Sequence, residues 1–268
     1  KVLKTESRKI ILKDVSHLEL DIIVITQDLK QKLGIGVVKS GKLKMIKLME
    51  ILNIDSLTYG KPQPKHIKKM NGDLGLFNGF PIKNYLSYPP NKNSSEKTKS
   101  EIKYVQSIER DEDFIKKADN VSGYFREYIE SLGYDFPKKH VKKLLDDSSK
   151  IILKIKYHYN RPRPSDLAKI FGYQLDNFYM KSMGTPAYPS GHSTQGILIA
   201  LVLSDMFPEH KQELMKLGMD ISNSRQMSKA HYPSDSKFGK KIGGDFSMKE
   251  KIREAGEGEG RREKKAGF

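Results

Sequence analysis

The spacing of apolar and polar residues along the chain predicts helices over most of its length. Five segments place apolar side chains at helical intervals with polar residues between them: residues 96–107, 112–132, 138–159, 192–206 and 209–226. Few alternations of the period that builds strands interrupt these segments. The segment that contains ILIALVL is the most apolar of the five. We expect it to be a buried core helix, because it is too short to cross a membrane. The pattern therefore indicates an all-α domain.

The two ends of the chain have a different pattern. Near the N-terminus, the pattern predicts two short strands and one helix, at residues 10–12, 20–25 and 42–52. Near the C-terminus, the sequence becomes charged and rich in glycine, which is typical of a disordered tail. We therefore expect three parts: a small, mixed, basic N-terminal segment of unknown role over residues 1–77, a helical domain over 78–248, and the tail over 249–268.

The charge of the chain favours anionic partners without choosing among them. Lysine and arginine outnumber aspartate and glutamate, which gives a formal net charge of +16 and a sequence pI of about 9.6. A lysine-rich surface that only solvates the protein gives the same balance, so charge alone does not define a function. The chain has no cysteine, which excludes disulfides, thiolate metal sites and a phosphatase with a cysteine nucleophile.

The first of three short motifs is a pair of cations at the end of a predicted helix. Lys154 and Arg161 are seven residues apart, which is close to two helical turns and places both on one side. A guanidinium binds two phosphate oxygens as a fork, and a lysine adds a point charge. Pro162 follows Arg161 and favours an end to the helix. A basic helix face that ends at proline is also common in proteins that bind no phosphate.

The second motif, Pro-Ser-Gly-His, directly precedes the apolar core helix. Free backbone N–H groups at a helix start bind anions, and Gly191 lets the backbone approach a ligand closely. Ser190 can cap the helix or bond a phosphate oxygen. His192 stands at the mouth of this anion site, where a histidine can protonate a leaving alkoxide. An ordinary capped helix start has the same residue types.

The third motif combines a cation, a histidine and a carboxylate. Arg225 is a second fork-shaped anion binder, and His231 and Asp235 follow it, four residues apart from each other. A helical turn can bring such a carboxylate onto one ring nitrogen. That contact fixes the histidine tautomer and frees the other nitrogen as a nucleophile. A simple surface pair has the same spacing, so the argument rests on the occurrence of all three motifs in this order.

Together, the three motifs resemble the signature of the superfamily of type 2 phosphatidic acid phosphatases, bacterial class A non-specific acid phosphatases and vanadium-dependent haloperoxidases. That signature is Lys-x6-Arg-Pro, Pro-Ser-Gly-His and Ser-Arg-x5-His-x3-Asp, and this chain matches it at residues 154–162, 189–192 and 224–235. The resemblance covers about residues 80–240 and is greatest to small soluble members, including phage-encoded ones. It implies a helical bundle.

The resemblance also implies a phosphatase that acts on phosphomonoesters in two steps. His231, oriented by Asp235, is expected to attack phosphorus and form a phosphohistidine, and His192 is expected to protonate the leaving oxygen. Five residues are expected to hold the phosphate oxygens: Lys154, Arg161, Ser190, Gly191 and Arg225. Three cations stabilise the charge of phosphoryl transfer, and no carboxylate cluster suited to Mg²⁺ stands out, so we expect no metal and no cofactor. Vanadate, which mimics phosphate, is expected to inhibit.

The chain departs from the family pattern just before the nucleophilic histidine. Many relatives have a glycine two residues before it, where this chain has Lys229. A lysine there either crowds the rim of the pocket or adds a fourth cation. The departure bears on the size of the substrate and not on the type of reaction.

Two other functions stay open. A vanadium-dependent haloperoxidase would hold vanadate as a cofactor with the same residues, although those enzymes are usually much larger than this chain. A virion component or other structural protein could use the phosphatase fold as a scaffold, which the basic N-terminal segment and the tail suggest.

The sequence also bounds the partners and the location. The expected partner is a small phosphorylated substrate, and association into a homo-oligomer or with a virion stays open. Nucleic acid is not an expected partner, because no basic motif is interleaved with aromatic residues. The protein is expected to be soluble, in the cytoplasm, in the periplasm or secreted, or associated with a virion.

Overall fold

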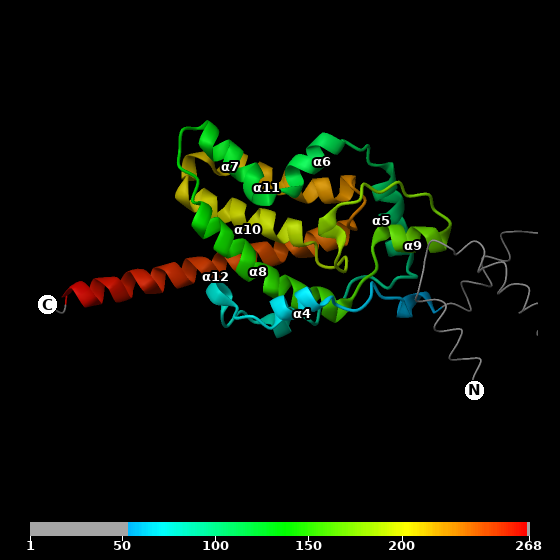
Figure 1. Cartoon of the computed structure of the whole chain (residues 1–268), viewed down its shortest axis with the longest axis horizontal. Helices are drawn as coiled ribbons and strands as arrows, with labels where there is room; N and C mark the ends of the chain where they lie inside the picture. The colour runs from blue at the N-terminus through cyan, green and yellow to red at the C-terminus, as the bar shows by residue number, and fades with distance from the viewer. Residues whose placement is uncertain (1–52, 267–268) are drawn as a thin grey trace, which may run out of the picture. The chain divides into compact units, whose positions relative to one another are not determined.

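The computed structural model describes residues 53–266, with side chains described for residues 53–255. The described residues form a bundle of helices (Figure 1), and none of them lies in a strand, which confirms the expected all-α class. The α-helices are, in chain order, α4 Pro64–Met70, α5 Glu96–Ser107, α6 Glu112–Asp119, α7 Val121–Ser131, α8 Lys138–Tyr159, α9 Pro164–Phe171, α10 Gly191–Met206, α11 Lys211–Met227 and α12 Pro233–Ala266. Short 3-10 helices occur at Ile54–Ser56, Gly75–Phe77, Ile82–Tyr85, Lys181–Met183 and Pro208–His210.

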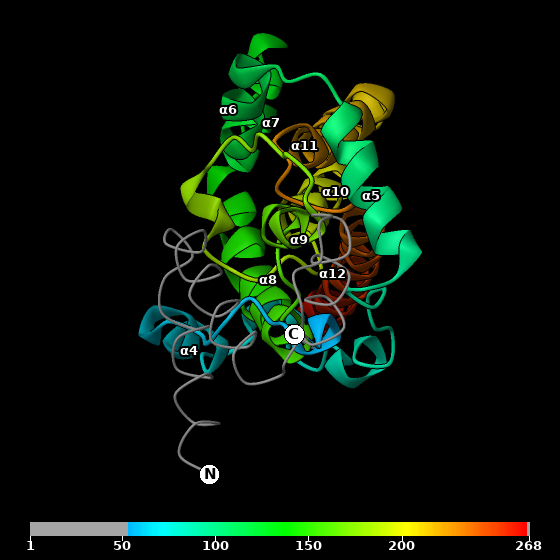
Figure 2. The same cartoon turned by 90° about the vertical axis from the view of Figure 1, so that its right-hand side faces the viewer.

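Helix α10 lies at the centre of the bundle, as its apolar sequence predicts. It packs between α11 and α12 (Figures 1 and 2), and glycines allow both contacts to be close. A Cβ added to Gly218 on α11 would lie 2.9 Å from the carbonyl oxygen of Gly196 on α10. A Cβ added to Gly239 on α12 would lie 2.5 Å from the Ser190 carbonyl oxygen. Small residues therefore set how near α11 and α12 come to α10.

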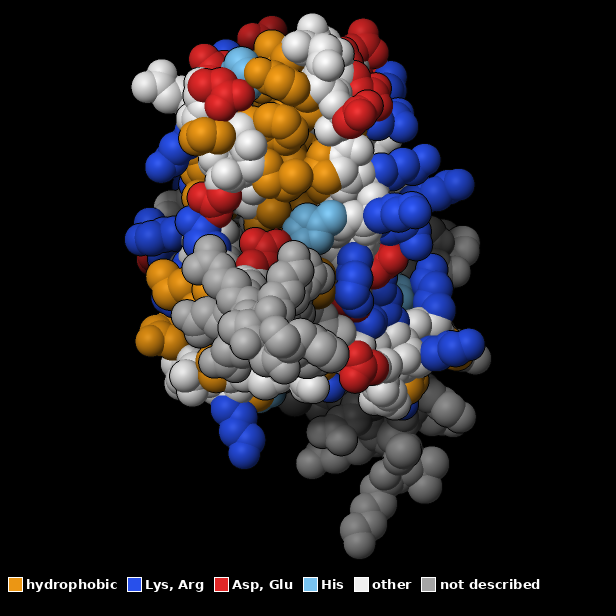
Figure 3. All heavy atoms as spheres, turned by 90° about the vertical axis from the view of Figure 1, so that its left-hand side faces the viewer, with side chains coloured by type: hydrophobic (Ala, Val, Ile, Leu, Met, Phe, Trp, Pro, Cys, Tyr) orange, Lys and Arg blue, Asp and Glu red, His pale blue; other side chains and the backbone are white. Residues whose placement is uncertain are grey.

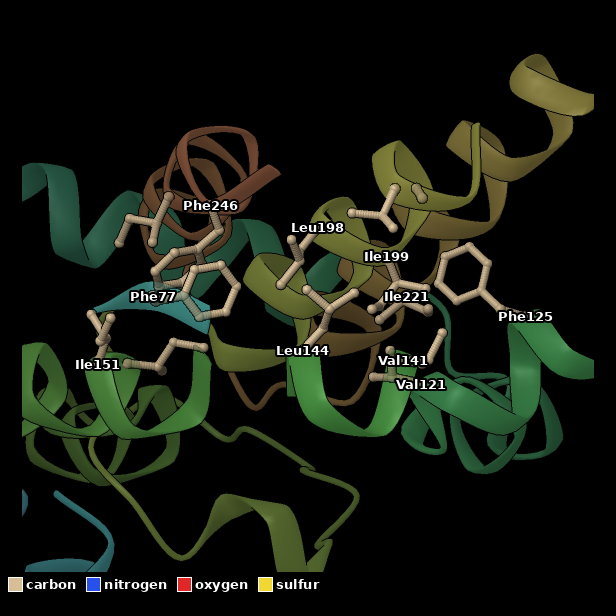
Figure 4. Packing of buried hydrophobic residues seen from close by; sticks show 14 of the residues in the cluster. Phe77, Val121, Phe125, Val141, Leu144, Ile151, Leu198, Ile199, Ile221 and Phe246 are labelled. Atoms are coloured by element: carbon tan, nitrogen blue, oxygen red, sulfur yellow. The ribbon is translucent and has the colours of Figure 1, made fainter. Parts of the chain in front are cut away.

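A continuous hydrophobic core joins the helices (Figure 4). At one end of it, the rings of Phe77 and Phe246 are in contact, with centroids 4.5 Å apart. At the other end, Phe125 of α7 faces Ile199 of α10 and Ile221 of α11. Full burial of each such side chain contributes roughly 1.5–3 kcal/mol relative to exposure. The core therefore holds α7, α8, α10, α11 and α12 as one unit.

Four of the five predicted helices are confirmed, and one is wrong. The predicted bounds of α5 and α8 are the observed ones, and those of α10 and α11 differ by one or two residues. The predicted helix over residues 112–132 is two helices, because the chain breaks at Asn120. The side chain of Asn120 accepts a hydrogen bond from the Gly123 N–H at 3.0 Å and so starts α7. Apolar periodicity continues across this break and gives no sign of it.

The helical unit begins earlier than the predicted boundary at residue 78. The compact unit that contains the bundle begins at Asn53. Phe77 is fully buried in its core, and the Asn93 side-chain amide donates to the Ile54 carbonyl at 3.0 Å. Residues 53–77 contain two 3-10 helices, the short helix α4 and loops, which have no apolar periodicity that links them to the bundle. The predicted strands and helix before residue 53 lie outside the described residues.

The predicted tail continues α12, which extends to Ala266 (Figure 1). Glu250 is almost fully buried, and the Arg253 guanidinium donates to its two carboxylate oxygens at 2.6 and 2.8 Å. A pair of opposite charges three residues apart stabilises a helix. The helix therefore passes residue 248 without a break, which the charged, glycine-rich composition did not predict.

The surface at the far end of the bundle carries a hydrophobic strip. Figure 3 shows it with charged side chains of both signs along its edges. Leu132, Tyr134 and Met206, at the ends of α7 and α10, are among the exposed large hydrophobic residues. Within the described part of the chain, no helix combines the length and the apolar character that a membrane span requires.

Candidate active site

The three sequence motifs meet at one end of the bundle, onto which Figure 2 looks. Helices α8 and α11 end there, and α10 and α12 begin there (Figure 1). Backbone hydrogen bonds join the motifs: the Ala187 N–H donates to the Arg161 carbonyl at 2.9 Å, and the Ser190 N–H donates to the Asp235 carbonyl at 3.0 Å. Residues that are far apart in the sequence therefore form one site.

His231 is held between a carboxylate and a guanidinium. Its Nδ1 lies 3.3 Å from Asp235 Oδ2, and its Nε2 lies 3.0 Å from Arg163 Nη1. A guanidinium has only donors, so Nε2 is the acceptor, and Nδ1 carries the proton that Asp235 accepts. This is the neutral tautomer, whose Nε2 lone pair can attack an electrophile.

The surroundings of His231 favour its neutral form. Burial lowers the pKa of His231 well below the ordinary value of 6.5, because charging the ring would remove a cation from water. The positive charges of Arg163, Lys156 and Arg225 lower this pKa further. An unprotonated nucleophile is therefore available even in acid.

Asp235 is itself fixed by a second arginine. Arg161 Nη1 donates to Asp235 Oδ1 at 2.6 Å, and the Tyr232 N–H donates to Asp235 Oδ2 at 3.0 Å. Burial raises the pKa of Asp235, and the charge of Arg161 opposes that rise. Arg161 also contacts Glu101 at 3.4 Å, and its guanidinium lies 3.7 Å from the centroid of the Tyr232 ring. Arg161 therefore supports Asp235, which in turn orients His231.

Three buried cations surround His231, and we call Lys156, Arg163 and Arg225 the cationic cluster. They are 4%, 3% and 1% exposed. Lys156 and Arg163 are oriented by hydrogen bonds that they donate to backbone carbonyls. The buried Arg225 Nε has no hydrogen-bond partner among the described residues. Burial, and then the charge of Arg225, lower the pKa of Arg163 to about 10. Cations crowded in a buried site gain stability when an anion joins them, so the cationic cluster can bind a phosphate group.

The cationic cluster differs from the predicted set of cations by two residues. The pattern Lys-x6-Arg-Pro occurs twice in the chain, starting at Lys154 and at Lys156. The first frame ends at Arg161, which is bound to two carboxylates, and its Lys154 is partly exposed. Lys154 makes no hydrogen bond or ion pair with the residues that the structure describes. The second frame ends at Arg163, and both of its cations lie in the cluster.

Helix geometry explains why the second occurrence of the pattern, and not the first, places its lysine beside His231. Residues two apart on a helix point about 200° away from each other. On α8, Lys156 therefore points into the bundle and Lys154 points outward. The helix ends at Tyr159, so neither arginine lies on it, and the prediction that two turns of helix separate Lys154 from Arg161 is wrong.

Ser190 and Gly191 form the start of α10 beside the cationic cluster. Ser190 is fully buried, and its Oγ accepts a hydrogen bond from the Ser193 N–H at 3.3 Å, which caps the helix. A Cβ added to Gly191 would lie 3.8 Å from Lys156 Cε. Glycine therefore leaves the helix start open toward Lys156, where its free N–H groups can meet an anion.

His192 has a partner that the motifs did not predict. Its Nε2 lies 3.1 Å from Asp119 Oδ1 and 3.1 Å from the Asp119 carbonyl oxygen. Burial and the charge of Arg225 lower the pKa of His192, and Asp119 opposes this. Asp119 is the last residue of α6. The signal for it is the break at Asn120, which sequence periodicity does not show.

Comparison with known proteins finds a family model that matches the part of the chain containing these motifs. Residues 148–246 match the model of the PAP2 superfamily. The matched PAP2 segment contains both histidines and the cationic cluster, whereas Asp119 lies before it.

Three curated proteins that the chain matches are acid phosphatases by name. A non-specific acid phosphatase of Salmonella typhimurium is 46% identical over 57 residues, which are 21% of this chain and 23% of that protein. One from Providencia stuartii is 30% identical over 142 residues, which are 49% of this chain and 56% of that protein. An acid phosphatase of Zymomonas mobilis is 31% identical over 100 residues, or 37% of each chain. The chain thus spans between about a quarter and about half of the length of these relatives.

Lys229, where the chain departs from the expected family pattern, does not join the cationic cluster. Its φ of 59° lies in the left-handed region, where glycine is favoured. Its Nζ donates to the Ile108 carbonyl, which directs the charge to the end of α5. The expected alternative of a fourth cation at the site is therefore wrong.

Proposed function

We propose that this protein is a phosphatase that hydrolyses phosphomonoesters through a phosphohistidine at His231, without a metal. The observation that carries this proposal is the position of His231 in the cationic cluster. Its Nε2 faces Arg163 while Asp235 holds its Nδ1. The PAP2 domain and the acid phosphatase relatives support the same reaction.

In the first step, the phosphate group enters the cationic cluster. Arg163 exchanges its contact with His231 Nε2 for one with a phosphate oxygen, and Nε2 attacks phosphorus. The bond between phosphorus and the ester oxygen breaks, and protonated His192 gives its proton to that oxygen, so that an alcohol leaves. The cationic cluster stabilises the charge on the transferred group, and Asp235 stabilises the positive charge that develops on His231.

In the second step, water replaces the histidine at phosphorus. His192, now neutral, accepts a proton from water as the water oxygen attacks. The bond between phosphorus and His231 Nε2 breaks, and inorganic phosphate leaves. His231 returns to its neutral form and His192 to its protonated form.

The donors at the site support a mechanism without a metal. Three cations surround His231, and the carboxylates that contact the two histidines of the site, Asp235 and Asp119, each also contact an arginine. Such surroundings repel a divalent cation and supply the charge that a metal would otherwise supply. Within the described residues, one group has the composition and spacing to hold a metal, and it joins α8 to α12: His140, Glu250 and Glu254.

The relatives favour ester hydrolysis over the halide oxidation of a haloperoxidase. Those reported above are acid phosphatases by name. Under this proposal, vanadate acts as an inhibitor that occupies the cationic cluster.

Hydrolysis of p-nitrophenyl phosphate tests the proposed function. The wild type is compared with His231→Ala and with His158→Ala, each with and without EDTA. His158 is exposed on α8 and packs edge-on against Tyr159, so its variant controls for the loss of a histidine. We expect His231→Ala to lose roughly 1,000-fold or more in kcat, and His158→Ala and EDTA to leave the rate near that of the wild type.

Three results would contradict the proposal. Undiminished turnover of His231→Ala would exclude His231 as the nucleophile. Complete loss in EDTA would exclude the mechanism without a metal. No turnover of several phosphomonoesters by the wild type at any pH would exclude the phosphatase.

A further inference from the structure

Asp119 is a carboxylate at the mouth of the site, on an element outside the matched PAP2 segment. It ends α6, and its side chain is 31% exposed. The break at Asn120 leaves the Asp119 carbonyl without a partner in its own helix, so this oxygen is free to accept from another group. The group that it meets is His192 Nε2, at 3.1 Å.

Three donors from three parts of the chain converge on a single oxygen of Asp119. His192 Nε2 on α10 lies 3.1 Å from Oδ1, and Arg225 Nη1 on α11 lies 2.8 Å from it. Ser182 Oγ, in the 3-10 helix Lys181–Met183, also donates to Oδ1 at 2.8 Å. Two of these donors, His192 and Arg225, are groups that the proposed reaction directs at the phosphate and the leaving oxygen.

We propose that Asp119 is a positioning residue that orients the general acid His192. Its carboxylate also pairs with Arg225, so that the substrate phosphate must compete with Asp119 for the Arg225 guanidinium. This inference rests on the proposed phosphatase function. It assigns two opposing effects to one carboxylate: it supports the proton transfer from His192, and it weakens the binding of the phosphate dianion.

The effect of Asp119 on His192 follows from which ring nitrogen of His192 is hydrogen-bonded. Nε2 is bound to Asp119, and Nδ1 has no partner among the described residues. When His192 is protonated, its Nε2–H stays on Asp119, and its Nδ1–H is the proton that passes to the leaving oxygen. Without Asp119, the ring can rotate and its positive charge loses a counter-charge.

The effect of Asp119 on phosphate binding follows from the negative charge of its carboxylate. The carboxylate of Asp119 contacts Arg225, which is also a member of the cationic cluster. A phosphate dianion that binds there meets a like charge and competes for the same guanidinium. Removal of this charge should tighten phosphate binding, which a residue with a purely structural role would not do.

Asp119→Asn is the variant that separates the two effects, because the amide keeps the size of the side chain and removes its charge. Asp113→Asn is the matched control, since Asp113 is exposed on the same helix and, among the residues that the structure describes, forms an ion pair with Lys116. We expect Asp119→Asn to lower kcat roughly 10- to 100-fold. We also expect it to lower the inhibition constant of inorganic phosphate roughly 5-fold.

The choice of substrate sharpens the test. A nitrophenolate leaves with little help from an acid, whereas an alkoxide needs a proton. The loss in kcat should therefore be larger for an alkyl phosphate than for p-nitrophenyl phosphate. Asp119→Glu, which restores the charge, should recover part of the loss.

The pH profile gives an independent readout. The charged and titratable groups around His192 are Asp119 of α6, Arg225 of α11, Lys156 of α8 and His231 before α12. Of these, Asp119 is the one that raises the pKa of His192, while burial and Arg225 lower it. Without the carboxylate, His192 loses its proton at a lower pH. The alkaline limb of kcat should therefore move to lower pH in Asp119→Asn and not in Asp113→Asn.

The outcomes distinguish this inference from the proposed function. If the wild type hydrolyses phosphomonoesters but Asp119→Asn matches Asp113→Asn in kcat, pH profile and phosphate inhibition, the inference is wrong and the phosphatase stands. If the wild type has no activity, the proposed function is wrong. Calorimetry with inorganic phosphate then still tests whether the Asp119 carboxylate weakens phosphate binding. Equal or weaker binding of phosphate by Asp119→Asn than by the wild type overturns this effect, and tighter binding supports it.

Discussion

At the scale of single residues, the site depends on which of two similar side chains points inward. Lys154 and Lys156 lie on the same helix, two residues apart, and each begins a Lys-x6-Arg-Pro pattern. Lys156 is 4% exposed and donates to the Pro186 carbonyl, and burial lowers its pKa well below the ordinary value. Lys154 is partly exposed on the other side of α8. The same residue type therefore has two different environments within one helical turn.

This difference predicts the effect of removing each lysine. Lys156→Ala should lower kcat/KM for p-nitrophenyl phosphate by roughly 100-fold or more, because a charged donor to the transition state is lost. Lys154→Ala, the matched control on the same helix, should change it less than about 2-fold, since a partly exposed charge without a partner contributes little. Steady-state kinetics of both variants check this. The opposite order of effects would assign the phosphate to the first frame.

The sequence predicts most of the site but not this choice. The second and third motifs each occur once in the chain, so the sequence places their residues without ambiguity: Ser190, Gly191, His192, His231 and Asp235. Lys-x6-Arg-Pro has two overlapping frames, and spacing alone cannot choose between them. The choice depends on which side of α8 faces the bundle and on where that helix ends, and both are tertiary properties.

At the scale of elements, short breaks and close contacts between helices position the site. The break at Asn120 ends α6 at Asp119, which brings a carboxylate to His192. The contact of α12 with the start of α10 depends on Gly239, next to the Ser190 carbonyl. Apolar periodicity identified α5, α8, α10 and α11 with nearly their observed lengths, but it did not identify α4, α9 or α12. It did not show the break, because Asp119 and Asn120 occupy positions where polar residues also suit a continuous helix.

Two glycines of α12 should respond to alanine in opposite directions. A Cβ on Gly239 would lie 2.5 Å from the Ser190 carbonyl oxygen, so Gly239→Ala should destabilise the protein by about 1–3 kcal/mol through overpacking. A Cβ on Gly244 would meet no atom within 4 Å, so Gly244→Ala should stabilise the helix by up to about 1 kcal/mol. Urea unfolding of both variants measures this. A stabilised Gly239→Ala would contradict the close packing of α12 on α10.

At the scale of the whole molecule, the ends of four helices bring the reacting groups together. Cations come from α8, from the chain after it and from α11, one histidine comes from the start of α10, and the other precedes α12. The all-α class and the order of the motifs could be predicted from the sequence. The start of the compact unit at Asn53 and the full length of α12 could not, because buried contacts of short or charged segments decide them.

The central claim is that His231 becomes phosphorylated on Nε2 during turnover. Rapid mixing of the protein with a phosphomonoester, an alkaline quench and mass spectrometry of the peptides test it most directly, because phosphohistidine survives base. The account predicts a phosphoryl group on the peptide that contains His231 in the wild type, and none in His231→Ala. A phosphoryl group on another residue, or turnover in which no phosphorylated peptide forms under any quench, would contradict it.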